Sequence, residues 1–322
     1  MNIDMIRAAD VRLAPVVRRT PLLSSPFLDE IAGRRVLVKA ECLQHTGSFK
    51  FRGGWSALSG LPEAQRKNGV IAYSSGNHAQ GVAYAAARHG VPAVIIMPTD
   101  APALKMANTK ALGAEVVTYD RLTENREEIG IKLASERNLT LIKPYDEPLV
   151  IAGQGTVGLE IAQQAAVEGI ETADVLVCCG GGGLTSGIAL ALAADAPGLT
   201  VRPCEPDGFD DTTRSLASGT KQRNATQGGS ICDAIVTPEP GEITFPILQK
   251  HCGAGLVVSD TEALKAIAQA FLRLKIVLEP GGAVALAAAL FRTDEIQGDT
   301  VIVAATGGNV DPDIFRKALD TL

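Results

Sequence analysis

The sequence has few aromatic residues and no apolar run long enough to span a bilayer. Aromatic residues are 4% of the chain, and glycine supplies 33 of the 322 residues, a balance that suits close packing of helices on a sheet. The longest apolar runs, such as 281–291, are shorter than the roughly 20 residues of a membrane-spanning helix. The net charge of −6 argues against binding to nucleic-acid backbones or anionic membranes.

Neither the cysteines nor the histidines have the spacing of a metal site. The six cysteines include no C-x-x-C pair, and we expect all of them to be reduced in a cytoplasmic protein. The four histidines are scattered along the chain. The first residues include Asp4 and no apolar core, which predicts that they are not a signal peptide.

Short apolar runs alternate with helix-like stretches, and this alternation predicts an α/β fold with parallel sheets covered by helices. The break at 144–148, with two prolines, indicates a crossing between domains. We predict two domains, each an open, mostly parallel twisted sheet flanked by helices: a large one of 1–56 and 146–322, and a small one of 57–145. The expected strands are 35–39, 69–73, 91–97, 114–119, 174–179, 200–205 and 300–305, and the expected helices include 2–18, 51–59, 103–112, 123–137, 155–167, 184–194, 260–275 and 281–291.

A lysine in the stretch 45–54 is the first candidate for chemistry. Lys50 stands among small and aromatic residues, and its nearest acidic neighbour in the sequence is Glu41. A partly desolvated lysine has a lowered pKa, and its amine is then a nucleophile that forms a Schiff base with a carbonyl. Phe49 beside it is suited to packing on a flat ring. Taken alone, a solvated surface charge is the commoner role of a lysine.

Four consecutive glycines, 180–183, lie between a predicted strand and a predicted helix. Their backbone N–H groups can surround an anion at the helix N-terminus, and a phosphate is the natural guest. No Gly-Lys-Ser/Thr follows, so this is not a P-loop. A second pattern, Gly153, Gly155 and Gly158, matches the dinucleotide fingerprint G-x-G-x-x-G, but the apolar run before it is short and directly follows Pro148.

Two further loops and one acidic turn follow predicted strands. Loop 74–81 opens a helix, so its N–H groups suit a carboxylate, although Ser75 also fits a helix N-cap. Thr306 is placed to hydrogen-bond a ring nitrogen at the carboxyl end of a strand, where ligands of parallel sheets gather. A tight turn explains 306–309 equally well. The acidic loop 205–211 suits a hard divalent cation or is a solvated turn.

Lys50, the Ser-Gly-Asn-His loop at 75–78, the four glycines and the Thr-Gly-Gly-Asn at 306–309 occur in that order along the chain. In this combination the sequence resembles the serine/threonine dehydratase and serine racemase family, fold type II of the pyridoxal-phosphate enzymes and similar to tryptophan synthase β. The resemblance covers nearly the whole chain. It implies that Lys50 forms the Schiff base with pyridoxal 5′-phosphate, that Phe49 backs the pyridine ring and that Asn77 bonds its 3′-oxygen.

The resemblance also implies roles for the remaining loops, and a homodimer. Thr306 would face the pyridine nitrogen, where the family more often has Ser or Cys. Some members hold a divalent cation, Mg or Ca, which would here be bound by Glu205, the carbonyl of Phe209 and Asp211. Another departure is Asp233-Ala234, where the family usually shows Asp-Gly. The phosphate cradle would be Gly180, Gly181, Gly182, Gly183 and Leu184, and the substrate would contact Ser74, Ser75, Gly76, Asn77, His78 and Arg126.

The predicted activity is β-elimination of water from L-threonine or L-serine, giving a 2-oxo acid and ammonia. Lys50 would remove the Cα proton, and Ser75, by resemblance on the opposite ring face, would reprotonate Cα or bind the carboxylate. Arg126 matches a position near the substrate mouth in racemase-like members, which keeps 3-hydroxyaspartate dehydratase and serine racemase as alternatives. An NAD-linked oxidoreductase, based on 153–158, and a non-catalytic amino-acid-binding protein are alternatives of other classes.

Overall fold

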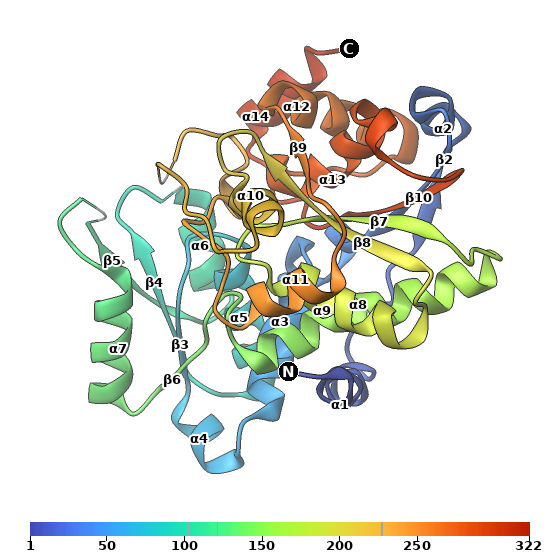
Figure 1. The fold of residues 1–322 in the computed structure, drawn as a ribbon. Helices are drawn as coiled ribbons and strands as arrows, with labels where there is room; N and C mark the ends of the chain where they lie inside the picture. The colour runs from blue at the N-terminus through green and yellow to red at the C-terminus, as the bar shows by residue number, and fades with distance from the viewer. Residues whose placement is uncertain (102, 121, 227) are drawn as a thin grey trace.

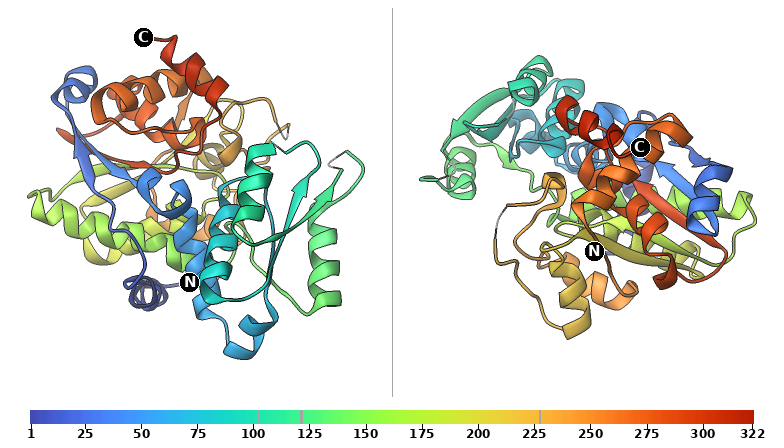
Figure 2. Two further views of the ribbon diagram at one scale, coloured as in Figure 1. Left: turned by 180° about the vertical axis from the view of Figure 1, so that it is seen from behind. Right: turned by 90° about the horizontal axis from the view of Figure 1, so that it is seen from above.

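The computed structural model describes residues 1–101, 103–120, 122–226 and 228–322. It contains two sheets that are flanked by helices (Figure 1). The four-stranded sheet with its helices forms one side of the molecule, and the view from behind shows the same division (Figure 2). The predicted α/β class with two mostly parallel sheets is therefore confirmed, while the domain boundaries at 56/57 and 145/146 stay a prediction.

The larger sheet has the strand order β1-β2-β10-β7-β8-β9. Strand β1 runs antiparallel to β2, and every other neighbouring pair is parallel. Strands β7 and β10 are buried almost throughout because helices cover both faces of the sheet. Its strands are Leu22–Ser24 (β1), Arg35–Ala40 (β2), Ala173–Cys178 (β7), Leu199–Pro206 (β8), Leu256–Val258 (β9) and Thr300–Ala305 (β10).

The smaller sheet is wholly parallel and has the order β5-β4-β3-β6. Strands β3 and β4 are completely buried at its centre. The strands are Val70–Tyr73 (β3), Ala93–Pro98 (β4), Glu115–Tyr119 (β5) and Thr140–Leu141 (β6), and the helices that follow or precede them are Glu63–Asn68 (α4), Asn77–His89 (α5), Ala103–Ala111 (α6) and Arg126–Arg137 (α7).

The remaining helices cover the larger sheet or join it to the smaller one. They are Ile3–Leu13 (α1), Pro26–Ala32 (α2), Lys50–Gly60 (α3), Pro148–Val167 (α8), Gly183–Asp195 (α9), Asp211–Ser218 (α10), Thr244–His251 (α11), Asp260–Gln269 (α12), Pro280–Phe291 (α13) and Pro312–Leu319 (α14). No helix in the described part of the chain is both long and apolar enough to cross a membrane. All six cysteines are free thiols.

The glycine pattern at 153–158 has a structural role inside α8. The sequence predicts that this helix starts near residue 155, but it begins at Pro148, a residue type that suits the first helical position. A Cβ atom at Gly153 would lie 2.3 Å from the carbonyl oxygen of Arg52 in α3, and one at Gly155 would lie 2.9 Å from that of Gly187 in α9. These glycines therefore permit close helix packing, and the strand–turn–helix of a dinucleotide site is absent from this segment.

A buried network of charges joins strand β2 to helices α3 and α8. The guanidinium of Arg52 donates to both carboxylate oxygens of Glu41, at 2.8 and 2.7 Å, and to Glu160 Oε1 at 2.8 Å. Glu160 also accepts from the ammonium of Lys39. The side chains of Arg52, Lys39 and Glu41 are 0% exposed. Two cations and two carboxylates thus neutralise one another where water is excluded.

We predict that Arg52→Ala lowers the free energy of unfolding by about 3–5 kcal/mol, because it leaves the buried carboxylate of Glu41 without a cation and that of Glu160 with Lys39 alone. Urea unfolding of the purified protein measures this change. The matched control is Arg7→Ala, which breaks the exposed pair with Asp195 and should cost no more than about 1 kcal/mol. Equal effects of the two substitutions would contradict the assignment of Arg52 to the core.

Candidate active site

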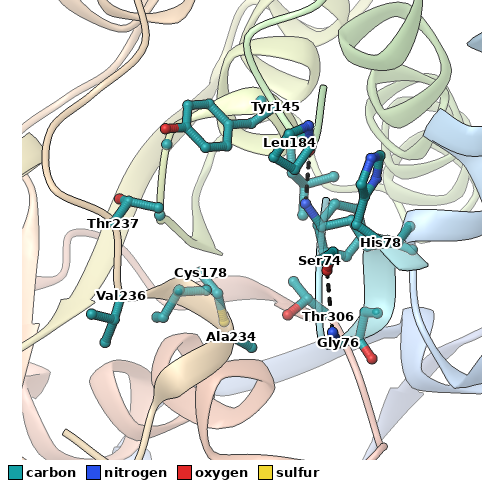
Figure 3. Close-up of a pocket in the computed structure, with 18 of the residues that line it drawn as sticks. Ser74, Gly76, His78, Tyr145, Cys178, Leu184, Ala234, Val236, Thr237 and Thr306 are labelled. Carbon is teal, nitrogen blue, oxygen red and sulfur yellow. Dashed lines mark hydrogen bonds between the residues drawn. The ribbon is translucent and has the colours of Figure 1, made fainter. Parts of the chain in front are cut away.

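A cavity of about 190 Å³ lies where the carboxyl ends of β3, β7 and β10 meet. Strand β3 leads into Ser74, β7 into the glycine loop, and β10 into Thr306, so parallel strands of both sheets deliver their loops to one place. In Figure 3, Val236, Thr237 and Cys178 lie across the cavity from Ser74, Gly76 and His78. The structure therefore brings together the four stretches of the chain that the sequence analysis singled out.

Lys50 is the first residue of α3, and its side chain reaches into the cavity. Its ammonium donates to the carbonyl oxygen of Pro144 at 2.9 Å and lies 5.1 Å from the centroid of the Phe49 ring. Burial lowers the pKa of the Lys50 amine to about 8, against a smaller opposing effect of the Glu279 carboxylate. The uncharged form of this amine, which a nucleophile or base requires, is therefore far easier to reach near neutral pH than that of an ordinary lysine.

The four glycines form a turn that leads into the N-terminus of α9. Gly182 has φ +87°, and a Cβ atom there would lie 2.8 Å from a methyl carbon of Leu248. A Cβ atom at Gly181 would lie only 2.2 Å from the ring of Tyr145. Any side chain would thus displace the loop. The first-turn N–H groups of α9 have no acceptor within the helix, so the loop can accept an anion.

Loop 74–78 presents small polar groups to the cavity. The Ser74 hydroxyl accepts from the backbone N–H of Gly76 at 3.1 Å (Figure 3). The N-cap of α5 is Gly76 and not Ser75, so Ser75 lines the cavity without a capping role. His78 is buried, and its Nε2 contacts the carbonyl oxygen of Ile142 at 3.0 Å. Burial and the nearby charge of Lys50 lower the pKa of His78 to about 3, so this imidazole is neutral.

Asn77 is held from both sides by residues that are far away in the sequence. Its amide nitrogen donates to the carboxyl group of Glu279, and its oxygen accepts from the amide of Asn309 at 2.7 Å. Glu279 lines the cavity, and burial raises its pKa to about 7. The sequence analysis did not identify Glu279 as a site residue. The only feature that marks Glu279 in the sequence is its position immediately before the proline that opens α13.

Thr306 follows β10 and is 4% exposed beside Cys178. Burial raises the pKa of the Cys178 thiol to about 11, although the hydroxyl of Thr306 opposes this rise. Cys178 is therefore a neutral neighbour, and Thr306 brings a hydroxyl group to the cavity wall. This arrangement suits the contact with a ring nitrogen that the resemblance implies, and the contact itself stays a prediction.

Arg126 opens α7 and lies at the edge of the cavity, with its guanidinium 5.4 Å from the centroid of the Tyr73 ring. Among the described residues it has no hydrogen-bond or ion-pair partner. Another cavity residue, Thr237, has a buried hydroxyl that also lacks a partner within the described ranges. Lys105 and Asp233 approach to 3.8 Å across the same cavity. Asp233, Thr237 and Lys105 are cavity residues that the sequence analysis did not select.

The acidic loop predicted to bind a cation lies outside the cavity. Glu205 is the penultimate residue of β8. Its carboxylate accepts hydrogen bonds from the N–H groups of Thr212 and Thr213, at 3.0 and 2.7 Å, in the first turn of α10. Burial raises the pKa of Glu205 to about 8 and that of Asp211 to about 7. The buried Oδ2 of Asp211 has no hydrogen-bond partner in the described part of the chain. No cluster of three acidic, cysteine or histidine ligands occurs among the described residues.

Comparison with known proteins gives relatives that match along almost the whole chain. The L-threo-3-hydroxyaspartate ammonia-lyase of a Pseudomonas species is 45% identical over 317 residues, which is 98% of this chain and 97% of the relative. The serine racemase of Schizosaccharomyces pombe is 40% identical over 317 residues, 98% of this chain and 96% of the relative. A solved T.th. threonine deaminase superimposes with a TM-score of 0.91 at 45% identity, covering 97% of this chain and 99% of that one.

The sequence match extends to a family model described as pyridoxal-phosphate dependent enzyme, which covers residues 13–307. This range includes the lysine, the four glycines and Thr306 that line the cavity. The chain belongs to the family of pyridoxal-phosphate dependent enzymes.

Proposed function

We propose that this protein is an ammonia-lyase that removes water from a β-hydroxy amino acid and releases a 2-oxo acid and ammonia. The observation that carries the proposal is the position of Lys50. Its amine, with a pKa lowered to about 8, lies in the same cavity as the glycine turn of α9. L-threonine and L-serine are the substrates that the sequence predicts, and the ammonia-lyase relatives support the reaction class.

The residues around the cavity fit pyridoxal phosphate. The glycine turn lines the cavity with no side chain over its backbone N–H groups, which suits a phosphate, Phe49 is beside the lysine, and Thr306 offers a hydroxyl. When bound, the cofactor supplies the electron sink for a carbanion at Cα. Lys50 would hold its carbonyl carbon, the glycine turn its phosphate, and Asn77 its 3′-oxygen.

The chain's own groups account for the proton movements of the elimination. The Cα–H and Cβ–O bonds of the amino acid break: the amine of Lys50 takes the Cα proton, and the β-hydroxyl receives a proton, from the Lys50 ammonium so formed or from a bound water, and leaves as water. Hydrolysis of the resulting enamine then gives the 2-oxo acid and ammonia. The carbonyl of Pro144 orients this amine when it is not covalently engaged. The N–H groups of loop 74–78 suit the substrate carboxylate, and the Ser75 hydroxyl could return a proton to Cα, which is how a racemase activity would arise. The serine racemase relatives support keeping this side reaction.

A second substrate, L-threo-3-hydroxyaspartate, is favoured by one specific observation. Arg126 is a cation at the cavity edge that lacks a partner among the described residues. A neighbouring hollow is lined by Arg126 and also by Arg223. Arg223 is paired with Glu239, so Arg126 is the cation that suits a substrate with a second carboxylate. The relatives that are named for hydroxyaspartate support the same choice.

We also propose a divalent cation, Mg or Ca, on Glu205, the Phe209 carbonyl and Asp211. Burial and, after it, the neighbouring carboxylate of Asp211 raise the pKa of Glu205, and a bound cation would favour the charged form of both groups. Asp211 Oδ2 has no described partner. Oxygen ligands of this kind suit a hard cation. Cytoplasmic location and a homodimer stay predictions of the sequence analysis.

Lys50→Ala should lower kcat for L-serine by more than about 10³-fold, because it removes both the covalent attachment and the base. Release of 2-oxo acid measures turnover, and mass spectrometry after borohydride reduction should find the cofactor on the Lys50 peptide of the wild-type protein only. The control is Lys67→Ala, an exposed lysine paired with Glu63, which should behave as wild type. Full turnover by Lys50→Ala would overturn the proposed function.

Arg126→Ala should lower kcat/KM for L-threo-3-hydroxyaspartate about tenfold to hundredfold, since a charge-assisted hydrogen bond to the second carboxylate is lost. The same parameter for L-serine should change by less than about threefold. Arg137→Ala is the control on the same helix, because Arg137 pairs with Glu115 at the surface. Equal losses with both substrates would argue against a carboxylate contact of Arg126.

Millimolar Mg²⁺ or Ca²⁺ should raise the melting temperature of the wild-type protein, and a chelator should reverse the rise, because a ligand that binds only the folded state stabilises it. Asp211→Asn should abolish the shift. Asp207→Asn, a change at an exposed position of the same loop, should preserve it. If neither cation altered the melting temperature of the wild-type protein, the proposed metal site would be contradicted.

A further inference from the structure

Gln154 is a buried polar residue whose hydrogen-bonding groups are not used. It lies in the interior of α8, lines the cavity and is 0% exposed. Neither Nε2 nor Oε1 of its amide has a hydrogen-bond partner among the described residues. Most buried polar groups in native proteins are hydrogen-bonded, so an amide with both ends unpaired calls for a missing partner.

The amide of Gln154 is placed between the two parts of the site that would hold the cofactor. A Cβ atom at Gly183 would lie 2.8 Å from Gln154 Oε1, and one at Gly53, three residues after Lys50, would lie 3.0 Å from Nε2. The amide therefore packs between the first turn of α3 and the first turn of α9. Both of these turns begin at the cavity.

A second group without a strong partner lies in the same first turn of α9. Thr185 is 0% exposed and lines the cavity, and its hydroxyl has no hydrogen-bond partner within the described ranges beyond the weakly polar thiol of Cys179 nearby. The backbone N–H groups of this turn also lack intrahelical acceptors. A side-chain amide, a hydroxyl and several peptide N–H groups thus lie at one helix N-terminus. This set matches the oxygens of a phosphate dianion once the amide presents its nitrogen in place of its oxygen.

We propose that the amide of Gln154, flipped so that Nε2 in place of Oε1 faces Gly183, and the hydroxyl of Thr185 complete the phosphate cradle, with Nε2 and Oγ1 donating to the cofactor phosphate. The inference rests on the proposed function and extends it, because the sequence analysis confines the cradle to Gly180–Gly183 and Leu184. Before the cofactor binds, the unpaired amide destabilises the protein. The amide at residue 154 therefore strengthens cofactor binding but lowers the stability of the apoprotein.

The test is Gln154→Leu, which removes both polar atoms at similar volume. In the apoprotein, titration with pyridoxal phosphate should show a Kd raised about tenfold to hundredfold, the effect of a lost hydrogen bond to a charged group. The Kd of pyridoxal, which has no phosphate, should stay near the wild-type value. The melting temperature of the apoprotein should rise by a few degrees, since an unsatisfied buried amide is gone.

Gln164→Leu is the matched control, because Gln164 is on the same helix but its amide is hydrogen-bonded to Lys39 and to the carbonyl of Thr20. This control should lower the melting temperature and leave both Kd values unchanged. Thr185→Val, an isosteric change, repeats the test should Gln154→Leu fail to fold, and it should weaken binding of pyridoxal phosphate but not of pyridoxal.

Two results would overturn the inference alone: pyridoxal phosphate binding as tightly to Gln154→Leu and Thr185→Val as to the wild type, or equal losses of pyridoxal phosphate and pyridoxal. The first result would assign the unpaired atoms to buried water. A wild-type apoprotein that binds no pyridoxal phosphate would overturn the proposed function as well, so the two failures are distinguishable.

Discussion

The close approach of helix α8 to α3 and α9 is the constraint on which the rest of the site depends. Helices α3 and α9 carry Lys50 and the glycine turn at their N-termini, and α8 is the element that both of them contact. The contact is possible only because Gly153, Gly155 and Gly187 have no side chains to separate the backbones. The distance between the lysine and the anion cradle is therefore set by backbone packing.

The charge network around Arg52 fixes the same helices in rotation as well as in distance. Arg52 is two residues after Lys50 and binds Glu160 of α8 through a guanidinium that is completely buried. A buried pair of this kind tolerates little change in geometry, since any displacement would leave a charge unsatisfied. The turn of α3 that presents Lys50 is thus held by a neighbour on its own helix.

Much of the fold can be predicted because the pattern of apolar residues along the chain indicates which segments are buried. The strands at the centre of each sheet are continuous apolar runs, and their predicted positions lie close to the observed ones. The sequence does not predict the short edge strands β1, β6 and β9, because a strand of two or three residues is defined by its partner and not by its own pattern. Pro148 reads as a break in the sequence, whereas it opens α8, since proline fits both roles.

The candidate site can be predicted only where the sequence itself carries a signature. Lys50 and the four glycines lie in short local patterns, and the structure places them in one cavity. Glu279 and Thr237 belong to no local pattern, because their positions depend on contacts across the fold: Glu279 meets Asn77, which is 202 residues away. In the sequence, Gln154 is a variable position between Gly153 and Gly155 of the dinucleotide-like pattern, and nothing there indicates that its side chain reaches the cavity.

The pKa values of Lys50 and Glu279 are shifted toward each other by one cause. Both groups are removed from water, which lowers the pKa of the amine to about 8 and raises that of the carboxyl group to about 7. The charge of each group opposes the effect of burial on the pKa of the other. The cavity can therefore hold or release a proton near neutral pH at little cost.

The glycine turn has a consequence for how such a protein can evolve. Its recognition of an anion depends on main-chain atoms, and every substitution of Gly181 or Gly182 adds a Cβ atom that collides with Tyr145 or Leu248. Mutation at these positions can abolish the turn but cannot adjust it by small steps. Gradual adaptation of cofactor affinity is left to the side chains around the loop, where an exchange changes one hydrogen bond and leaves the backbone in place.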